Sequence, residues 1–164
     1  MFQLSIRHLQ AVEVCGDGNC FFRALSVCLH GHQENHSSLR KLVASHVSKQ
    51  SDAAHPADRA ALRRRAQEVA ADKFWPGEDI VLAASDYLQR PILVYVAHNT
   101  SSPIQYLPSS SINTLSAISV AFLEPGHYVA VTSVPNAHHS ILTTSNSRAD
   151  LSAMTDSSVF AFQG

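Results

Sequence analysis

Apolar positions recur every three to four residues along the first half of the chain, and this spacing predicts α-helices. The first predicted helix begins at Cys20, directly after a turn that contains two glycines, and Gly31 ends it. A second helix begins at Ser37 or Ser38, because either serine side chain can cap it. The last two predicted helices span residues 58–74 and 78–88, and Trp75-Pro76-Gly77 separates them.

After Pro91 the pattern changes to that of β-strands. Residues 92–96 form an unbroken apolar run with a β-branched or aromatic residue at four of five positions, which indicates a buried central strand. Residues 118–132 alternate in polarity or size around a Pro-Gly turn, so a β-hairpin is expected there. Shorter strands are expected at residues 11–15 and 104–107. Because the helices precede most of the strands, we predict an α+β (mixed α/β) domain.

The length and composition fit one compact domain followed by a tail. With 164 residues, of which 45% are apolar, the chain is long enough to bury a core. The last residues differ in composition, since nine of residues 140–158 are Ser or Thr. We therefore expect a folded domain at residues 1–134 and a loosely attached or disordered tail at residues 135–164.

Charge and hydropathy exclude several classes of function. The formal net charge of −1 argues against a broad nucleic-acid-binding face, which needs clustered Lys and Arg. No apolar run approaches the roughly 18–20 residues of a membrane span, and the first residues lack the pattern of a signal peptide. Three cysteines, an odd number, do not make a disulfide framework. We expect an intracellular, cytoplasmic protein.

The segment Asp17-Gly18-Asn19-Cys20 places a thiol in the first turn of a predicted helix. Unpaired N–H groups and the positive end of the helix dipole stabilise a thiolate there, and the glycine-containing loop leaves backbone N–H groups for an oxyanion hole. A nucleophilic cysteine also needs a base, and His127, just after Gly126, is the best placed of ten histidines. Taken separately, such a cysteine is more often structural, and such a histidine more often faces solvent.

Three stretches, in order along the chain, resemble the motifs of a known family. Residues 17–24 (Asp-Gly-Asn-Cys-Phe-Phe-Arg-Ala) resemble the cysteine motif of the ovarian-tumour (OTU) family of deubiquitinating cysteine proteases. Residues 126–129 resemble its histidine motif, and residues 75–85 with 91–95 resemble its central block. The resemblance covers residues 10–133. It implies a papain-like OTU fold, with a small central β-sheet flanked by helices.

The resemblance also implies a reaction and the roles of the residues in the two motifs. The implied reaction is hydrolysis of the isopeptide bond that joins the ubiquitin C-terminus to a lysine. Cys20 would be the nucleophile, and His127 the base that later protonates the leaving amine. Asp17 would complete the catalytic group by holding the loop, and with it the backbone of Gly18 and Asn19 would shape the oxyanion hole.

Three further residues would bind the substrate if the resemblance holds. Gly126 would let the slim Gly-Gly end of ubiquitin pass, because a side chain there would narrow the channel. Tyr128 and Trp75 would line or brace the same channel. Core packing is the alternative for both aromatic residues, and we favour it for Trp75.

One residue departs from the family pattern. Many family members carry Asp or Asn two residues after the histidine, where it orients the imidazole, and this chain has Val129 there. Alternation along a strand puts Val129 on the same face as His127, so the acid is not displaced by one residue. Either another polar residue arrives from elsewhere, with Asn99 and Glu13 as candidates, or the site works as a dyad, or the enzyme is weak. We favour a working dyad with a weakly held histidine.

Two other functions stay open beside the deubiquitinase. One is a catalytically weak or silent OTU-fold module that binds ubiquitin without cleaving it, and the other is a viral or polyprotein-processing OTU protease. For the deubiquitinase, the expected partners are ubiquitin or polyubiquitin chains, or a ubiquitin-like modifier, bound by a monomer. No cofactor, nucleic acid or membrane is expected.

Two clusters of polar residues are set aside. The three cysteines lack CxxC spacing, and the histidines between residues 30 and 36 are interpreted as surface residues, so no metal site is expected. The arginines at positions 59, 63, 64 and 65 fit either a partner-binding patch or a solvated helix face, and we favour the solvated face.

Overall fold

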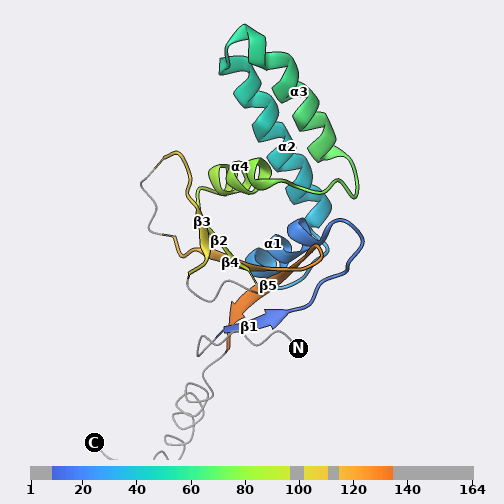
Figure 1. Cartoon of the computed structure of the whole chain (residues 1–164), viewed down its shortest axis with the longest axis vertical. Helices are drawn as coiled ribbons and strands as arrows, with labels where there is room; N and C mark the ends of the chain where they lie inside the picture. Colours follow the sequence, from blue (N-terminus) through green and yellow to red (C-terminus); the bar gives the residue numbers. More distant parts are fainter. Residues whose placement is uncertain (1–8, 97–101, 111–114, 135–164) are drawn as a thin grey trace, which may run out of the picture. The chain divides into compact units, whose positions relative to one another are not determined.

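The structure is a computed structural model that describes residues 9–96, 102–110 and 115–134 (Figure 1). The predicted tail at residues 135–164 and the candidate Asn99 lie outside these residues, so both stay predictions. The described elements, in chain order, are β1 (Leu9–Val12), α1 (Cys20–His30), α2 (His36–Ala53), α3 (Pro56–Ala70), α4 (Glu78–Leu88), β2 (Ile92–Val96), β3 (Ile104–Tyr106), β4 (Ile118–Leu123) and β5 (His127–Ser133).

The predicted helices all form, and no side-chain hydrogen bond caps the start of α1, α2 or α4. Gly31 ends α1 as predicted, with a left-handed φ of 78° that glycine adopts without steric cost. Helix α4 has the predicted bounds. Helix α2 begins at His36, so Asn35 and not Ser37 or Ser38 occupies the cap position.

The boundaries of α3 differ from the prediction at both ends. The helix begins at Pro56 rather than Asp58, because proline suits the first helical turn and the His55 ring accepts a hydrogen bond from the following turn. It ends at Ala70 rather than near Phe74. Beyond Ala70 the chain leaves the helical path, since Ala71 is extended with a ψ of 138° and Lys73 adopts a positive φ of 63°.

The five described strands form one mixed sheet in the order β1-β5-β4-β2-β3. Strands β2 and β4 are parallel, and the other neighbours are antiparallel. The predicted hairpin is confirmed: β4 and β5 pair, and Leu123 lies opposite His127. Strand β1 runs over residues 9–12 rather than 11–15, because Val12 is the last residue that pairs with β5.

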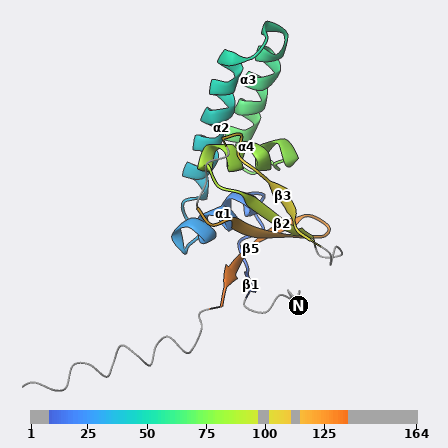
Figure 2. The ribbon, with the colours of Figure 1, turned by 90° about the vertical axis from the view of Figure 1, so that its left-hand side faces the viewer.

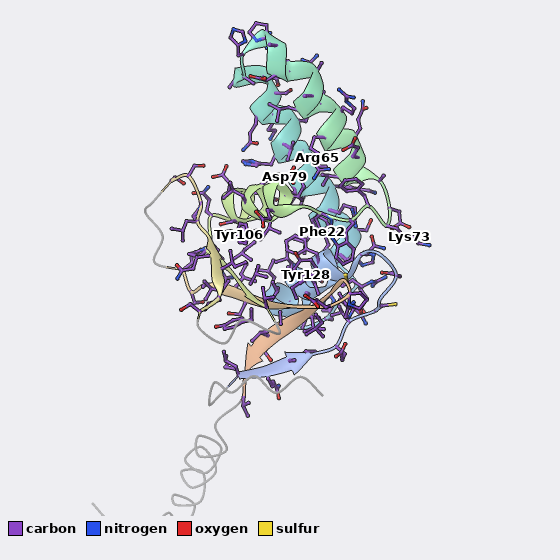
Figure 3. The ribbon with its side chains drawn as sticks, viewed as in Figure 1. Phe22, Arg65, Lys73, Asp79, Tyr106 and Tyr128 are labelled. Atoms are coloured by element: carbon purple, nitrogen blue, oxygen red, sulfur yellow. The ribbon has the colours of Figure 1, made fainter. Side chains whose placement is uncertain are left out.

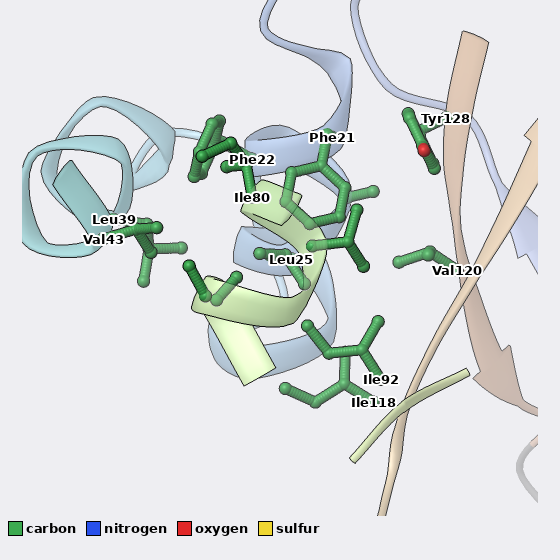
Figure 4. Close-up of a cluster of buried hydrophobic side chains, with 14 of the residues drawn as sticks. Phe21, Phe22, Leu25, Leu39, Val43, Ile80, Ile92, Ile118, Val120 and Tyr128 are labelled. Atoms are coloured by element: carbon green, nitrogen blue, oxygen red, sulfur yellow. The ribbon is translucent and has the colours of Figure 1, made fainter. Parts of the chain in front are cut away.

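The larger core lies between one face of the sheet and the helices, with α1 at its centre and residues of α2 and α4 packed around it (Figure 4). The ring of Phe21 in α1 meets the ring of Tyr128 in β5 at a centroid distance of 5.1 Å, and Leu25 is fully buried one turn later. On the other face of β5, Val129 belongs to a separate small apolar cluster. The packing of Phe21 against Tyr128 therefore fixes the start of α1 against the start of β5.

Helices α2 and α3 run side by side and extend away from the sheet, as two views at right angles show (Figures 1 and 2). Arg40, in the second turn of α2, bonds to Val69 near the end of α3 and to Asn19 directly before α1. Among the described residues, no helix is long and apolar enough to cross a membrane.

Candidate functional site

Cys20 is the first residue of α1, as predicted. Its side chain is only 2% exposed, and its sulfur accepts a hydrogen bond from the backbone N–H of Tyr128 at 3.5 Å. Tyr128 directly follows His127, so the thiol lies against the start of the strand that carries the predicted base. At the first helical residue, the thiol also lies at the positive end of the helix dipole.

The other two cysteines have different surroundings. Cys28 lies near the end of α1, where its thiol donates a hydrogen bond to the carbonyl oxygen of Ser119 at 3.2 Å. Burial raises the pKa of the Cys28 thiol, which keeps it protonated and unreactive. Cys15 is exposed, in the segment between β1 and α1. Cys20 therefore differs from Cys15 and Cys28 in its position at the start of a helix.

Asp17 braces the loop formed by residues 16–19, which we call the nucleophile loop. Its carboxylate accepts hydrogen bonds from the backbone N–H of Asn19 at 3.1 Å and from Nε and Nη2 of Arg23 at 3.1 and 2.6 Å. The Arg23 guanidinium is the main reason why the pKa of Asp17 is well below its usual range. At neutral pH, Asp17 is thus a charged anchor for the loop.

The backbone N–H groups near the sulfur are not equivalent. The N–H of Asn19 is donated to Asp17, whereas the N–H groups of Gly18 and Cys20 have no protein acceptor among the described residues. Gly18 has a positive φ of 87°, and a Cβ there would lie 2.9 Å from the Cβ of Lys73, so only glycine fits. The candidate oxyanion donors are therefore Gly18 and Cys20, and Asn19 is not among them.

His127 opens β5, and its side chain is 25% exposed. Its Nε2 lies 3.6 Å from the carboxylate of Glu13, one of the two polar candidates that the sequence offered. The Nδ1 edge faces Gly16, where an added Cβ would lie 3.8 Å away. Glu13 itself is 77% exposed, so water screens its attraction for the imidazole. Val129 is fully buried in the small apolar cluster.

Trp75 lies beside Gly126 and Tyr128. A Cβ on Gly126 would be 3.5 Å from the indole, and Gly126 has a positive φ of 153°. The Trp75 ring is tilted by 33° to the Tyr128 ring, with 5.9 Å between centroids. Tyr128 is 8% exposed, as core packing predicts, but Trp75 is 41% exposed. The core-packing interpretation of Trp75 is therefore wrong.

The segment of residues 71–77, which we call the Trp75 loop, is anchored from two sides. On one side, Arg65 of α3 lies over the ring of Phe74, which belongs to this loop. Arg65 also forms a bidentate pair with Asp79 in the first turn of α4, just after the loop, with N–O distances of 2.7 and 2.8 Å (Figure 3). Arg65 is thus not part of a solvated face, unlike Arg63, which is 61% exposed.

From inside, the Trp75 loop is bound to the nucleophile loop. The side chain of Asn19 donates to the carboxylate of Asp72 at 3.0 Å and accepts from the backbone N–H of Lys73 at 3.2 Å. Arg40 of α2 donates to both loops, and this residue was not predicted from the sequence. A signal was present, because position 40 is three, four and seven residues before buried positions of the same helix face.

Among the described residues, no three His, Cys, Asp or Glu side chains are grouped so that they could hold a metal ion. The chemistry that this site supports is that of a thiol, an imidazole and backbone donors.

The chain is similar to known proteins over most of its length. A profile of the family described as OTU-like cysteine protease matches residues 15–128. The ovarian tumor domain-containing deubiquitinating enzyme 7 of Arabidopsis thaliana is 26% identical over 137 residues, which cover 82% of this chain and 36% of that protein. The chain spans about a third of the length of the curated relatives it matches.

Solved structures show the same fold. The OTU domain of OTUD1 has a TM-score of 0.63 and 25% identity, over 76% of this chain and 86% of that one. An OTU domain in complex with ubiquitin has a TM-score of 0.59 and 20% identity, over 76% of this chain and 69% of that one. Since the profile spans the nucleophile loop, α1 and the start of β5, this chain belongs to the family of OTU-like cysteine proteases.

Proposed function

We propose that this protein is a deubiquitinating cysteine protease that hydrolyses the isopeptide bond after the ubiquitin C-terminus. The observation that carries the proposal is the position of Cys20, at the start of a helix and 3.5 Å from the backbone nitrogen that follows His127. Family membership, the named activity of the Arabidopsis relative and the ubiquitin bound to a similar OTU domain support the choice of substrate.

The first half of the reaction forms a thioester. The Cys20 thiolate attacks the carbonyl carbon of the last ubiquitin residue, and the carbonyl oxygen becomes negatively charged. The free N–H groups of Gly18 and Cys20 donate hydrogen bonds to this oxygen. The protonated His127 then gives its proton to the lysine amine as the C–N bond breaks.

The second half releases ubiquitin. The neutral His127 removes a proton from water, the resulting hydroxide attacks the thioester, and the Cys20 thiolate leaves. Because Glu13 lies next to Nε2, the nitrogen that exchanges protons with the thiol and water is Nδ1. An exposed carboxylate at 3.6 Å orients the imidazole weakly, so we propose a site that works nearly as a dyad.

The substrate tail is proposed to pass along the surface that Trp75 and Gly126 form together, since a Cβ on Gly126 would already contact the indole at 3.5 Å. The exposed indole offers a flat apolar wall, and Gly126 adds no side chain that would narrow the path. Tyr128 contributes to this surface indirectly, because its buried ring packs against the indole of Trp75. This arrangement favours a slim C-terminus such as Gly-Gly.

We further propose that the protein acts as a monomer in the cytoplasm, on ubiquitin or polyubiquitin chains. Its three cysteines are free, and an unpaired reactive thiol suits a reducing compartment.

The proposal is tested by incubating the protein with di-ubiquitins of every linkage and with ubiquitin that carries an electrophilic C-terminus. We expect cleavage and covalent labelling, both lost in Cys20→Ala and kept in the matched variants Cys15→Ala and Cys28→Ala. Affinity for ubiquitin without cleavage or labelling would show a silent binding module. No reaction and no binding would show that another substrate is cleaved.

A further inference from the structure

Arg40, in the second turn of α2, carries a guanidinium that is buried between two loops. The residue is 2% exposed. Its Nη1 donates to the carbonyl oxygens of Val69 and Phe74 at 3.0 and 3.1 Å. Its Nη2 donates to the side-chain oxygen of Asn19 at 2.8 Å and to the carbonyl oxygen of Gly18 at 3.4 Å. One planar group therefore binds the nucleophile loop and the Trp75 loop at once.

The surroundings of this charge are unusual. All four acceptors are neutral oxygens, and Nε has no partner among the described residues. The guanidinium lies over the ring of Phe22, with its carbon 4.5 Å from the ring centroid. No carboxylate touches this buried cation, but Asp72 and Asp17 lie near enough to attract it and offset part of its desolvation cost.

The consequence of these bonds is seen at Asn19, the cap residue of α1. An asparagine at this position usually accepts a hydrogen bond from the backbone N–H groups of the first helical turn. Here its oxygen accepts from Arg40 and from the backbone of Lys73, and its nitrogen donates to Asp72. No side-chain hydrogen bond caps α1. The first-turn N–H groups beside the Cys20 sulfur are therefore left open.

We propose that Arg40 is a positioning residue for Cys20: it holds the Asn19 side chain away from the start of α1, so that the uncapped helix end serves the thiolate and the oxyanion. The same guanidinium fixes the carbonyl of Gly18, whose N–H is an oxyanion donor in the mechanism above, so the inference rests on the proposed function. Without Arg40, the Asn19 oxygen is free to turn back and cap α1.

The test follows the reactivity of Cys20 without ubiquitin. The rate of alkylation by iodoacetamide is measured from pH 5 to 10, by mass spectrometry of the Cys20 peptide, in the parent, Arg40→Met, Arg40→Lys and Asp72→Ala. We expect Arg40→Met to react about tenfold more slowly at neutral pH, with its rise in rate moved up by about one pH unit. Asp72 is exposed, and Asp72→Ala removes only the acceptor of the Asn19 side-chain nitrogen. Its pH profile of alkylation should therefore shift in the same direction as that of Arg40→Met, but by less.

Arg65→Met is the matched control, because Arg65 binds the outer side of the Trp75 loop and makes no contact with Asn19. It should melt at a lower temperature but keep the parent's alkylation profile. In Arg40→Lys, which keeps the charge but not the planar fork, kcat on a fluorogenic ubiquitin substrate should fall more than KM changes.

If Arg40→Met proves unfolded, the alkylation profiles of Asp72→Ala and Arg40→Lys test the inference instead. Folded variants with the parent's alkylation profile would overturn the inference. A parent protein that fails to cleave ubiquitin would refute the proposed function instead, because the alkylation profile is measured without ubiquitin.

Discussion

Replacing Val129 by Asp restores the residue that many OTU proteases carry two positions after the histidine, and here it should harm the protein. Val129 is fully buried in the cluster that it forms with Ala121 and Val131, against Leu9 and Tyr95. An Asp there loses about 1.5–3 kcal/mol of apolar burial. The desolvation of its carboxylate adds to this loss, for a total of about 4 kcal/mol.

For a domain of this length, about 4 kcal/mol corresponds to a melting temperature lower by about 15 °C. Turnover of the folded fraction should not rise, because the side chain at position 129 lies in the buried apolar cluster, whereas the Nε2 of His127 faces the exposed Glu13. Thermal unfolding by circular dichroism and kcat on a fluorogenic ubiquitin substrate at low temperature measure the two effects. Val129→Thr, which keeps the shape of the side chain without a charge, is the control and should cost about 1–2 kcal/mol. A Val129→Asp protein that melts like the parent and has a higher kcat would refute the reasoning.

Three further predictions concern single residues of the site. Glu13→Gln should lower kcat by about two- to fivefold at low ionic strength. Salt at 1 M should remove the difference, because the ion pair of Glu13 with His127 is exposed. An unchanged kcat at low salt would mean that the histidine is held without Glu13. Asp17→Asn should lower the unfolding free energy by about 2 kcal/mol at pH 7. Since Arg23 lowers the pKa of Asp17 in the folded state, the carboxylate stabilises the fold above pH 4, and denaturant titrations should show the gap between the proteins closing as the pH falls below 4; a gap that widens in acid would contradict this assignment. Trp75→Ala should fold normally and lower kcat/KM on ubiquitin substrates by about tenfold, with iodoacetamide alkylation of Cys20 unchanged; equal kcat/KM values would remove Trp75 from the substrate channel.

Local patterns were enough to predict most of the secondary structure. Periodicity and the Gly31 stop signal predicted α1, and the apolar run at residues 92–96 predicted β2 with its observed bounds. The end of α3 was missed because the chain becomes extended at Ala71, although the apolar pattern continues toward Phe74. The carbonyls of Val69 and Phe74, on either side of this point, bond to Arg40, which is 29 and 34 positions away in the chain, and such long-range bonds leave no local signal.

The candidate site was predictable to a similar degree. The sequence placed Cys20 at a helix start and named Glu13 as one of two polar candidates near His127, but only the fold brings Glu13 to 3.6 Å. The use of the Asn19 N–H by Asp17 could have been foreseen, because Asp side chains commonly accept from the backbone two residues later. The part played by Arg40 could not, since its four acceptors belong to three separate segments.

The burial of Cys20 has a consequence for covalent inhibitors. A sulfur in a residue that is 2% exposed is reached only by a narrow electrophile, whereas Cys15 is open to any reagent. Broad aromatic warheads should therefore collect on Cys15 and leave catalysis intact. Slender linear warheads that resemble a diglycine, approaching past Gly126, should reach Cys20 first. Selectivity between the two thiols of one molecule would then depend on the width of the reagent rather than on its intrinsic reactivity.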